Sequence, residues 1–557
     1  MLFRGGIVMI SINHITKYIN EKKIIDDVSF NIYEGDKTGL IGINGVGKST
    51  LLNMIIGKDS YYSGSIRVKG QIGYLPQDLS SDKEKTVEEF LEKYTNDKGI
   101  STILKNLNIK SKYNQQLKSL SGGEKTRVYL AKAILSKANI LILDEPTNHL
   151  DSDGIQWLSE FISKFHGCVL IVSHDRYFLD QTVTNILELD EGNIKEYKGN
   201  YSNYKRTKDK ELEKQAIEYE KYKKERKRLE IAARKQMERA NKYNNMSQND
   251  FYRGKAATIA KKSKAIASRI EKLDKVEKPK EVTGLNISFD NQKNKVGNIL
   301  IKGENIKKTY NDLLFKNVNF EITRGKRIGI IGKNGVGKTT LLKGIIGSEE
   351  LEGNLYISPS TKMGYFSQEL KNLNENLSIL DEMRKHCSNQ SYIRTLLGCM
   401  LFKGEDIFKK IGDLSFGERV RVAFLKLVLE GNNLLVLDEP TNFLDITSRE
   451  KIEEILIDYE GAILFVSHDQ YFVEKMAEEI WEIEDNKLNR YLGDYEYYLS
   501  KKIDRNENQN LKKEQILNLE MELSSISFKL NLCKEEEKEE LEKRYFEISK
   551  KLNQLKR

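Results

Sequence analysis

Short, strongly apolar runs alternate with amphipathic stretches through most of the 557-residue chain. Runs such as KTGLI (37–41), LILD (141–144) and LVLD (435–438) have the length and composition of buried strands, and the stretches between them favour helix. This alternation predicts α/β domains. The pattern is interrupted in two places, residues 201–297 and 501–557, where long polar segments rich in helix formers replace the apolar runs.

The alternation occurs twice because the chain contains an internal repeat of about 290 residues. LIGINGVGKSTLLNMIIG returns as IIGKNGVGKTTLLKGIIG. Four further pairs follow in the same order: IGYLPQD and MGYFSQE, LSGGEKTRVYLAKAIL and LSFGERVRVAFLKLVL, ILILDEPTNHLD and LLVLDEPTNFLD, VLIVSHDRYF and ILFVSHDQYF. We therefore predict two copies of one domain, residues 1–200 and 298–500. The interdomain segment is then 201–297 and the C-terminal extension 501–557.

Composition narrows the class of protein. Apolar residues make up 39% and charged residues 31% of the chain, and no run of 18 consecutive apolar residues is present, so we expect no membrane-spanning helix. Four scattered cysteines without metal-ligand spacing predict reduced thiols and a cytoplasmic protein. No secretory signal pattern is found at the N-terminus, and the RGG before Met9 resembles a translated ribosome-binding sequence, which makes Met9 a second candidate start.

A glycine-rich loop between a strand-type run and a helix-type run fits G-x-x-x-x-G-K-[ST] at 42–49 and again at 332–339. Glycines let backbone N–H groups turn toward phosphate oxygens, and the helix that follows offers its positive end. We expect Lys48 and Lys338 to bind the β- and γ-phosphates of ATP. The expected ATP contacts in the two loops are Gly42, Asn44, Gly45, Gly47, Lys48, Ser49, Thr50, Gly332, Asn334, Gly335, Gly337, Lys338, Thr339 and Thr340.

Two acidic residues end a buried-strand run in each copy. The first, Asp144 or Asp438, is suited to a Mg²⁺ ion, and the second, Glu145 or Glu439, is placed to polarise the attacking water as a general base. With the loop hydroxyls and one glutamine from each copy, the candidate Mg²⁺ ligands are Ser49, Gln77, Asp144, Thr339, Gln368 and Asp438.

A histidine follows the second acid by 29 residues in each copy, at His174 and His468. The chain has only six histidines, and two of them occupy matching positions, so we expect both to orient the γ-phosphate and the attacking water. Gln77 and Gln368 also match and are candidates for contact with the metal or the water.

These motifs, in this order, resemble an ATP-binding-cassette nucleotide domain. In that superfamily two cassettes sandwich ATP head to tail, so the signature segment of one copy completes the site headed by the lysine of the other. By this resemblance, the completing residues would be Ser121, Gly122 and Gly123 for the Lys338 site, and Ser415 and Gly417 for the Lys48 site.

Two details affect how the sites are expected to work. Phe416 stands where the signature pattern has glycine, which puts equal activity of the two sites in doubt. Tyr18 and Tyr310 precede their glycine loops by 24 and 22 residues, near where the superfamily stacks the adenine ring. An ordinary strand tyrosine is the alternative interpretation of both.

The interdomain segment carries the positive charge of the chain. Residues 201–280 contain 25 Lys and Arg against 12 Asp and Glu, a net charge of +13, whereas the entire chain has +9. Helix formers without Gly or Pro at about 205–240, and a second such run at about 252–277, predict an antiparallel hairpin joined near 241–251 that projects roughly 50–55 Å.

Basic residues and aromatics at the end of such a hairpin suit RNA, because lysines meet phosphates and rings stack on unpaired bases. A solvated helical linker is the alternative. With the tip placed at about 241–255, the candidate RNA contacts are Lys242, Tyr243, Asn244, Asn245, Met246, Phe251, Tyr252, Arg253 and Lys255.

Twin cassettes on one chain, DEPTNHLD and DEPTNFLD, and a charged insert between the copies are similar to the ABC-F family of ribosome-associated ATPases. The resemblance implies a monomer that pairs its own cassettes, with ATP and Mg²⁺ as cofactors. Its linker would enter the exit site of the 70S ribosome, contact peptidyl-site tRNA and large-subunit ribosomal RNA, and approach the peptidyl transferase centre.

The short spacing between Gln77 and Ser121 shows no added arm, which favours the subgroup that dislodges antibiotics from the ribosome. A housekeeping translation factor of the same family is the main alternative. The ATPase subunit of a drug exporter and a DNA-maintenance ATPase are further ones. The extension at 501–557 predicts a second helical hairpin around the polar segment CKEEEKEE. Its apolar positions are Ile516, Leu519, Leu523 and Ile526 before this segment and Leu541, Phe546, Ile548 and Leu552 after it.

Overall fold

The chain forms two compact units that do not coincide with the two sequence copies. The computed structural model describes residues 6–79, 84–92, 100–107, 109–147, 150, 152–246, 250–273, 298–310, 313–333, 335–367, 373–402, 404–442, 444–530 and 543–552. Unit 1 comprises Met1–Phe289, Leu373–Lys426 and Phe443–Asp458, and unit 2 comprises Asp290–Asn372, Leu427–Asn442 and Tyr459–Arg557. A helical part of the second copy, which we call the second-copy lobe (373–426 and 443–458), therefore belongs to unit 1.

Two sheets organise the first copy within unit 1. A six-stranded sheet has the order β5-β6-β7-β3-β8-β9, parallel except for the last pair, and a three-stranded antiparallel sheet has the order β2-β1-β4. The strands are β1 (Val8–Ile19), β2 (Lys22–Tyr33), β3 (Lys37–Ile41), β4 (Ser63–Val68), β5 (Ile72–Leu75), β6 (Ile140–Asp144), β7 (Cys168–Val172), β8 (Asn185–Asp190) and β9 (Asn193–Lys198). The predicted α/β architecture is confirmed.

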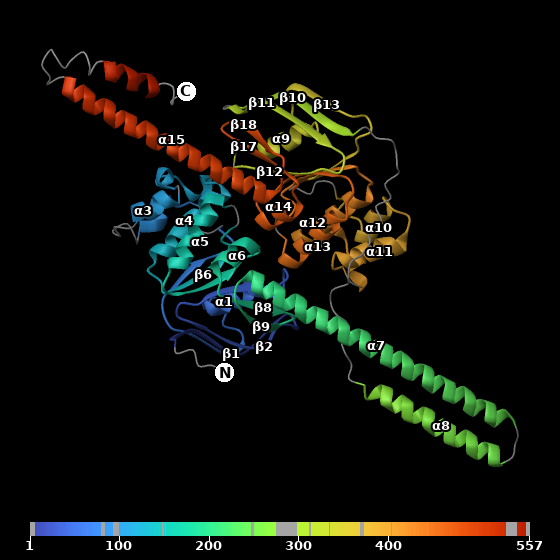
Figure 1. Cartoon of the computed structure of the whole chain (residues 1–557). Coiled ribbons are helices and arrows are strands. Elements are labelled where there is room, and N and C mark those ends of the chain that lie inside the picture. The colour runs from blue at the N-terminus through green and yellow to red at the C-terminus, as the bar shows by residue number, and fades with distance from the viewer. Residues whose placement is uncertain are drawn as a thin grey trace. The chain divides into compact units, whose positions relative to one another are not determined.

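The central strands are uninterrupted apolar runs because both faces of the six-stranded sheet are covered. Every residue of β3, β6 and β7 is buried. One face packs with α1 and the three-stranded sheet, and the other packs with α4, α5 and α6 (Figure 1). The helices of this copy are α1 (Lys48–Ile55), α2 (Val87–Leu91), α3 (Ile100–Asn106), α4 (Gly122–Leu135), α5 (Ser152–Lys164) and α6 (Arg176–Thr182), with single 3₁₀ turns at Lys110–Lys112 and Leu117–Ser119.

The second-copy lobe is helical. It contains α10 (Ile379–Arg384), α11 (Gln390–Cys399), most of α12 (Phe416–Leu429) and α13 (Ile446–Ile457), with 3₁₀ segments at Gly404–Phe408 and Ile411–Asp413. Ile446, the first residue of α13, packs against the apolar core of the first copy. The lobe is thus part of the same folded unit as the first copy.

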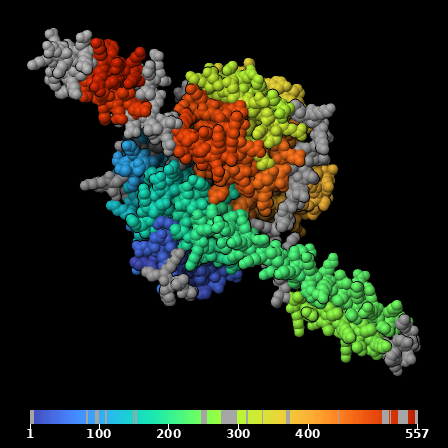
Figure 2. All heavy atoms as spheres, viewed as in Figure 1, coloured from blue at the N-terminus to red at the C-terminus, as the bar shows by residue number. Residues whose placement is uncertain are grey.

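The interdomain segment forms two long helices, α7 (Tyr201–Met246) and α8 (Asp250–Glu271), which lie side by side and project from the first copy as the arm (Figures 1 and 2). The predicted hairpin is confirmed: α7 ends at Met246 and α8 begins at Asp250, both inside the predicted junction at 241–251, although the helices reach further into it than expected. With no Gly or Pro between Tyr201 and Met246 to stop it, α7 continues at both ends, and its 46 residues span about 70 Å. Residues 274–277 of the second predicted helix lie outside the described part.

Small side chains hold the two helices of the arm together. Ala240 on α7 and Ala256 on α8 are buried, and Ser263 Oγ donates a hydrogen bond to the carbonyl oxygen of Ala233 at 3.0 Å. No large apolar residue of α7 beyond Tyr204, and none of α8, is fully buried among those described. The arm is therefore a thin helix pair whose stability depends on close approach of the two backbones.

Unit 2 repeats the sheets of the first copy. Its six-stranded sheet has the order β14-β15-β16-β12-β17-β18 and its three-stranded sheet the order β11-β10-β13. Trp481 lies fully buried against Phe320 in the core between them. The elements are β10 (Ile299–Thr309), β11 (Leu313–Thr323), β12 (Arg327–Ile331), α9 (Lys338–Ile345), β13 (Glu352–Ile357), β14 (Met363–Phe366), β15 (Leu434–Asp438), β16 (Ala462–Val466), α14 (Gln470–Met476), β17 (Glu479–Glu484), β18 (Lys487–Tyr491) and α15 (Tyr495–Leu530).

The C-terminal extension packs on itself, as its sequence predicted, through α15 and a helical segment at 543–552. Ile526, Ile548 and Leu552 are buried, and Arg544 Nη2 pairs with Glu522 Oε1 at 3.0 Å. The prediction for Phe546 is wrong, since its side chain is 75% exposed. Phe546 is two residues from Ile548, which places it on another face of a helix with 3.6 residues per turn. Leu541 lies outside the described residues.

Among the described residues, no helix is both long and apolar enough to cross a lipid bilayer.

Replacing the two buried alanines of the arm with larger residues should weaken the packing of α7 against α8. We expect Ala240→Leu combined with Ala256→Leu to push the helices apart at a cost of about 1–3 kcal/mol, because the backbones cannot separate without losing the Ser263 hydrogen bond. Limited trypsin digestion should then cut the arm faster than in the parent. Ala257→Leu on the exposed side of α8 is the matched control, and equal cleavage of both variants would contradict this packing.

Candidate functional site

The first glycine loop wraps around its own lysine. A side chain at Gly42 would meet the carbonyl oxygen of Leu189 at 2.4 Å, so this close approach needs glycine. Helix α1 begins at Lys48, whose Nζ donates to the carbonyl oxygens of Gly42 at 2.7 Å and Ile43 at 3.2 Å. Lys48 is buried, and this burial lowers its pKa. The lysine charge and the start of α1 thus lie together in the loop, as expected for a phosphate site.

The second loop has the same construction. Helix α9 begins at Lys338, whose Nζ donates to the carbonyl oxygens of Gly332 at 2.7 Å and Lys333 at 3.1 Å. Gly45 and Gly335, which occupy matching positions, have positive φ values of 78° and 83°. Asn334 lies outside the described residues. Ser49 is exposed, and Thr50 and Thr340 are partly exposed, on the first turns of α1 and α9.

The paired acids of the first copy are buried at the end of β6. Burial raises the pKa of Asp144 to about 6, against the opposing charge of Lys48. Burial also raises the pKa of Glu145 to about 7, again opposed by Lys48. The backbone of Glu145 has a φ of 52°, a left-handed conformation that costs free energy in a residue with a side chain, and its N–H donates to the carbonyl oxygen of Val172 at 2.8 Å.

His174 lies directly beside Glu145. The backbone N–H of His174 donates to Glu145 Oε2 at 3.3 Å, and His174 Nε2 lies 3.5 Å from Glu145 Oε1 and 3.1 Å from Asn44 Oδ1. Burial, reinforced by Lys48, lowers the pKa of His174 well below its ordinary value. Glu145 Oε1 and His174 Nδ1 are buried without a hydrogen-bond partner among the described residues. A buried acceptor of this kind is suited to a water or substrate hydrogen.

The second copy repeats the acid–histidine pair within unit 2. The backbone N–H of His468 donates to Glu439 Oε2 at 3.2 Å, His468 Nε2 lies 3.5 Å from Glu439 Oε1, and the φ of Glu439 is 50°. Thr339 Oγ1 donates to Asp438 Oδ1 at 3.1 Å, and burial raises the pKa of this aspartate. The structure therefore brings together the glycine loop, the two acids and the histidine in each copy.

The residues present fit a magnesium ion that is shared with a nucleotide. The Thr339–Asp438 contact joins a hydroxyl and a carboxylate, the oxygen donors that Mg²⁺ takes beside substrate phosphates. Among the described residues, no group of three or more His, Cys, Asp or Glu side chains could hold a metal by itself. Gln77 follows β5 with its side chain exposed, and Gln368 lies outside the described residues.

The signature serines begin helices. Ser121 caps α4, its Oγ donating to Glu124 Oε2 at 2.9 Å, and Ser415 Oγ donates likewise to Glu418 Oε2 at 2.6 Å at the start of α12. Gly122, Gly123 and Gly417 occupy the first turns of these helices. Phe416 takes the first position of α12 with its side chain exposed, and the helix forms from this residue onward.

The second-copy lobe supplies residues to the first site that the sequence analysis did not identify. Asp445, the N-cap of α13, accepts a hydrogen bond through Oδ2 from the backbone N–H of Asn44 at 3.1 Å. Arg449, on the first turn of α13, is buried, and its charge lowers the pKa of both Glu145 and His174. Asp445 could have been found from the sequence, because an LD pair ends both DEPTN motifs. Arg449 could not be found by comparing the copies, because Ile155 occupies the matching position in the first copy.

The remaining predicted positions lie on the surface. Tyr18 on β1 and Tyr310 after β10 are 56% and 55% exposed, and Tyr310 Oη donates to Glu349 Oε2 at 2.9 Å. A lysine lies over each ring, with Lys23 Nζ 5.8 Å from the centroid of Tyr18 and Lys308 Nζ 4.9 Å from that of Tyr310. On the arm, Lys242, Asn245 and Lys255 are exposed and Tyr243 is partly exposed. The backbone, but not the side chain, is described for Asn244, Met246, Phe251, Tyr252 and Arg253.

Comparison with known proteins agrees with this geometry. A family model described as "ABC transporter" matches residues 25–148 and again 315–442, and a second model with the same description matches 187–289. The first covers the glycine loop and the paired acids of each copy, and the second covers the arm. These matches show that the chain is an ATPase with two ATP-binding cassettes.

Relatives align along the full length of both copies. Ribosome protection protein VmlR of Bacillus subtilis is 33% identical over 98% of this chain and 98% of its own length. ABC transporter F family member 5 of Arabidopsis thaliana is 31% identical over 89% of this chain and 78% of its own length. Energy-dependent translational throttle protein EttA of Escherichia coli strain K12 is 31% identical over 86% and 92%.

The fold also matches a solved structure. A chain in the crystal structure of the complex of archaeal ribosomal stalk protein aP1 and archaeal ribosome recycling factor aABCE1 superposes with a TM-score of 0.60 at 20% identity, over 86% of this chain and 89% of that one. Tandem cassettes, an arm between them and full-length relatives at this level of identity lead to one assignment: the chain belongs to the ABC-F family of ATPases.

Proposed function

We propose that this protein is a ribosome-binding ATPase that protects the ribosome from antibiotics. The observation that carries the proposal is the basic arm rooted in an ATP-hydrolysing cassette. Between Gly254 and Ile270, α8 has five basic residues and no acidic residue. VmlR, a full-length relative, bears the name ribosome protection protein, and EttA is named a translational throttle.

The chemistry follows from the acid–histidine pairs, of which the Glu145–His174 pair is buried and the Glu439–His468 pair is partly exposed. Glu145 accepts a hydrogen bond from the attacking water and then its proton, since an unpartnered carboxylate oxygen with a raised pKa is a suitable base. Neutral His174 holds the water or the γ-phosphate through its ring nitrogens, and Glu439 and His468 do the same in the second copy. A Mg²⁺ ion, held by Ser49 and Asp144 or by Thr339 and Asp438, neutralises phosphate charge when bound.

The arm is suited to RNA by charge and by shape. Lys255, Lys261, Lys262, Lys264 and Arg269 are exposed along α8. On α7, by contrast, pairs such as Arg226–Glu230 at 2.9 Å and Arg234–Glu238 at 3.0 Å neutralise part of the charge. A thin helix pair with one predominantly basic helix can follow a phosphate backbone into a narrow channel.

In the proposed cycle, ATP closes the cassettes and stabilises a form that fits the ribosomal exit site. The arm then contacts peptidyl-site tRNA and large-subunit RNA near the peptidyl transferase centre, where its tip displaces a bound antibiotic. Hydrolysis reopens the cassettes and releases the protein, as in other γ-phosphate switches.

A housekeeping role in translation is the second candidate, because EttA aligns with this chain nearly as well as VmlR does. Both candidates require ribosome binding, and they differ in one phenotype. Loss of the protein should sensitise its host to drugs of the peptidyl transferase centre if it protects ribosomes, and should alter translation without drug if it is a housekeeping factor.

Removing the general base from both sites should trap the protein on ribosomes. Glu145→Gln with Glu439→Gln should reduce ATP hydrolysis roughly 100-fold or more while ATP still binds. In the presence of ATP this variant should sediment with 70S ribosomes more completely than the parent. Membranes and DNA serve as control partners in the same assay, and failure to accumulate on ribosomes would contradict the proposed switch.

The raised pKa of Glu145 gives the Lys48 site a defined pH dependence. As a base, Glu145 must be deprotonated, so hydrolysis should fall as the pH drops through about 7, roughly tenfold between pH 8 and pH 6. The Glu439→Gln variant isolates this site for the measurement. Binding of a fluorescent ATP analogue over the same range controls for lost affinity, and a rate that stays flat between pH 6 and 8 argues against Glu145 as the base.

Neutralising the arm should weaken ribosome binding without affecting hydrolysis. We expect Lys255→Gln, Lys261→Gln and Lys264→Gln together to reduce the slope of log affinity against log salt by about 1 for each lysine in phosphate contact. A matched triple, Lys302→Gln, Lys326→Gln and Lys362→Gln, removes the same charge from exposed positions of unit 2. Equal loss of binding in the two triples would show that net charge, not the arm, is responsible.

A further inference from the structure

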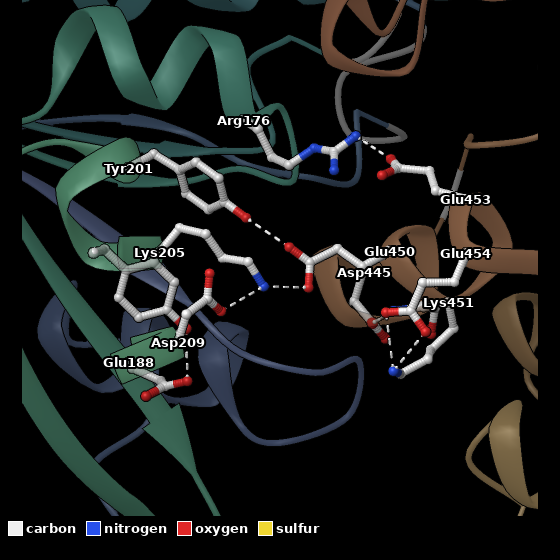
Figure 3. Close-up of polar contacts among 12 residues, drawn as sticks. Arg176, Glu188, Tyr201, Lys205, Asp209, Asp445, Glu450, Lys451, Glu453 and Glu454 are labelled. Carbon is white, nitrogen blue, oxygen red and sulfur yellow. Dashed lines mark hydrogen bonds and ion pairs between the residues drawn. The ribbon is translucent and has the colours of Figure 1, made fainter. Parts of the chain in front are cut away.

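One helix of the second-copy lobe contacts both the first ATP site and the base of the arm, all within unit 1. At its start, Asp445 caps α13 through Oδ1, which accepts from the backbone N–H of Ser448 at 2.8 Å, and holds the glycine loop through Oδ2. Further along α13, two carboxylates turn toward the first copy (Figure 3).

The first carboxylate, Glu450, reaches the beginning of α7. It accepts hydrogen bonds from Tyr201 Oη at 3.3 Å and Lys205 Nζ at 3.0 Å, and Lys205 also pairs with Asp209 at 3.2 Å (Figure 3). We call residues 201–209 the arm root. Tyr201 is buried and the Glu450 side chain is 19% exposed, whereas the Lys205 side chain is 35% exposed, so the contact is partly shielded from water and salt.

The second carboxylate, Glu453, forms a buried ion pair with Arg176. Arg176 is the first residue of α6 and lies two residues after His174. The same helix α13 therefore meets the glycine loop, the segment that carries the site histidine and the arm root. A displacement of α13 away from the first copy would therefore change all three contacts.

The arm root is also tied to its own copy. Glu188 on β8 accepts from Tyr204 Oη at 2.8 Å and from Lys208 Nζ at 2.8 Å. The second copy has the matching anchor at the start of α15, where Glu482 accepts from Tyr498 Oη at 2.8 Å and Lys502 Nζ at 2.7 Å. In both copies, therefore, a glutamate of the sheet anchors the helix that follows through a tyrosine and a lysine.

The contacts with α13 are different, because the repeat does not preserve them. Positions that match Arg176 and Lys205 are Gln470 and Leu499, and positions that match Glu450 and Glu453 are Gln156 and Ser159. None of these four residues is charged, so the reciprocal pair of contacts cannot form as ion pairs. The charged residues for an ion-paired connection between the copies are therefore present in one direction only.

We propose that α13 is a one-sided coupling element, in which Glu450 and Glu453 are positioning residues that tie the Lys48 site to the arm root. ATP bound at the Lys48 site fixes the second-copy lobe against the first copy, and α13 passes this constraint to Tyr201 and Lys205. The Lys338 site lacks the connection and does not set the arm root directly. Because linkage is reciprocal, a ligand on the arm alters nucleotide affinity at the Lys48 site.

Hydrogen exchange on the free full-length protein tests this without ribosomes. In the Glu145→Gln, Glu439→Gln background, ATP should slow amide exchange over 204–212 at least several-fold. Adding Glu450→Gln should abolish this ATP effect while leaving nucleotide binding intact. Glu454→Gln is the matched control on α13, since Glu454 is 55% exposed and pairs only locally with Lys451 in the described contacts.

A second variant addresses the contact from the arm side. Lys205→Met should also remove the ATP effect, whereas Lys210→Met, on an exposed position of the same helix, should retain it. ATP protection that persists in both Glu450→Gln and Lys205→Met would overturn the proposal. This outcome is independent of whether the protein binds ribosomes, which the sedimentation experiment decides separately.

A separate experiment tests whether only the Lys48 site is coupled to the arm root. Lys338→Ala should keep ATP-dependent protection of the arm root, and Lys48→Ala should lose it. If both lysine variants lose protection to the same extent, the two sites control the arm equally and the one-sided connection is wrong.

Discussion

Burial of a carboxylate beside a histidine, on a backbone that is held in a strained conformation, is the constraint on which each ATP site depends. The proposed role of Glu145 as a general base requires a pKa near neutrality, and burial raises the pKa of this carboxyl to about 7. The apolar strand β6 delivers the residue into the core, and the hydrogen bond from its backbone to β7 fixes its left-handed conformation. The same conformation recurs at Glu439. Burying the carboxylate oxygen Glu145 Oε1 without a hydrogen-bond partner lowers the stability of the fold, and the rest of the domain must offset this cost.

The cassettes themselves could be predicted from the sequence in detail, because phosphate binding and buried parallel strands impose short local patterns. The strand that ends at Ile41, the loop and the helix from Lys48 follow from glycine spacing and apolar runs alone. The positions of Asp144, Glu145 and His174 relative to one another required only the repeat. A site can be predicted from the sequence where a few neighbouring residues determine the backbone conformation.

Long-range and marginal features could not be predicted in this way. The end of α7 was placed too early, because a polar helix continues until something stops it, and its sequence gives no Gly or Pro before Met246. Phe546 was assigned to a packed face, but helix phase in a short segment is set by partners that periodicity does not identify. Neither Arg449 nor the Arg176–Glu453 pair has a counterpart in the other copy, so comparison of the two copies could not identify them. The division into units, with the second-copy lobe joined to the first copy, is a tertiary result.

Comparison of the two copies also shows what distinguishes the helix that begins the arm from its counterpart α15. Both copies end in the same anchor, a carboxylate on the fifth strand of the sheet that holds a tyrosine and a lysine of the next helix, Glu188 for α7 and Glu482 for α15. With the anchors alone, both helices would respond to their own cassette in the same way. The contacts of α13 with α7 and α6 have no charged counterpart in the repeat, and the buried Arg176–Glu453 pair on α6 would be costly to break. In the proposed mechanism, a few charged residues on α13 are what would make two copies of one domain act differently on the arm.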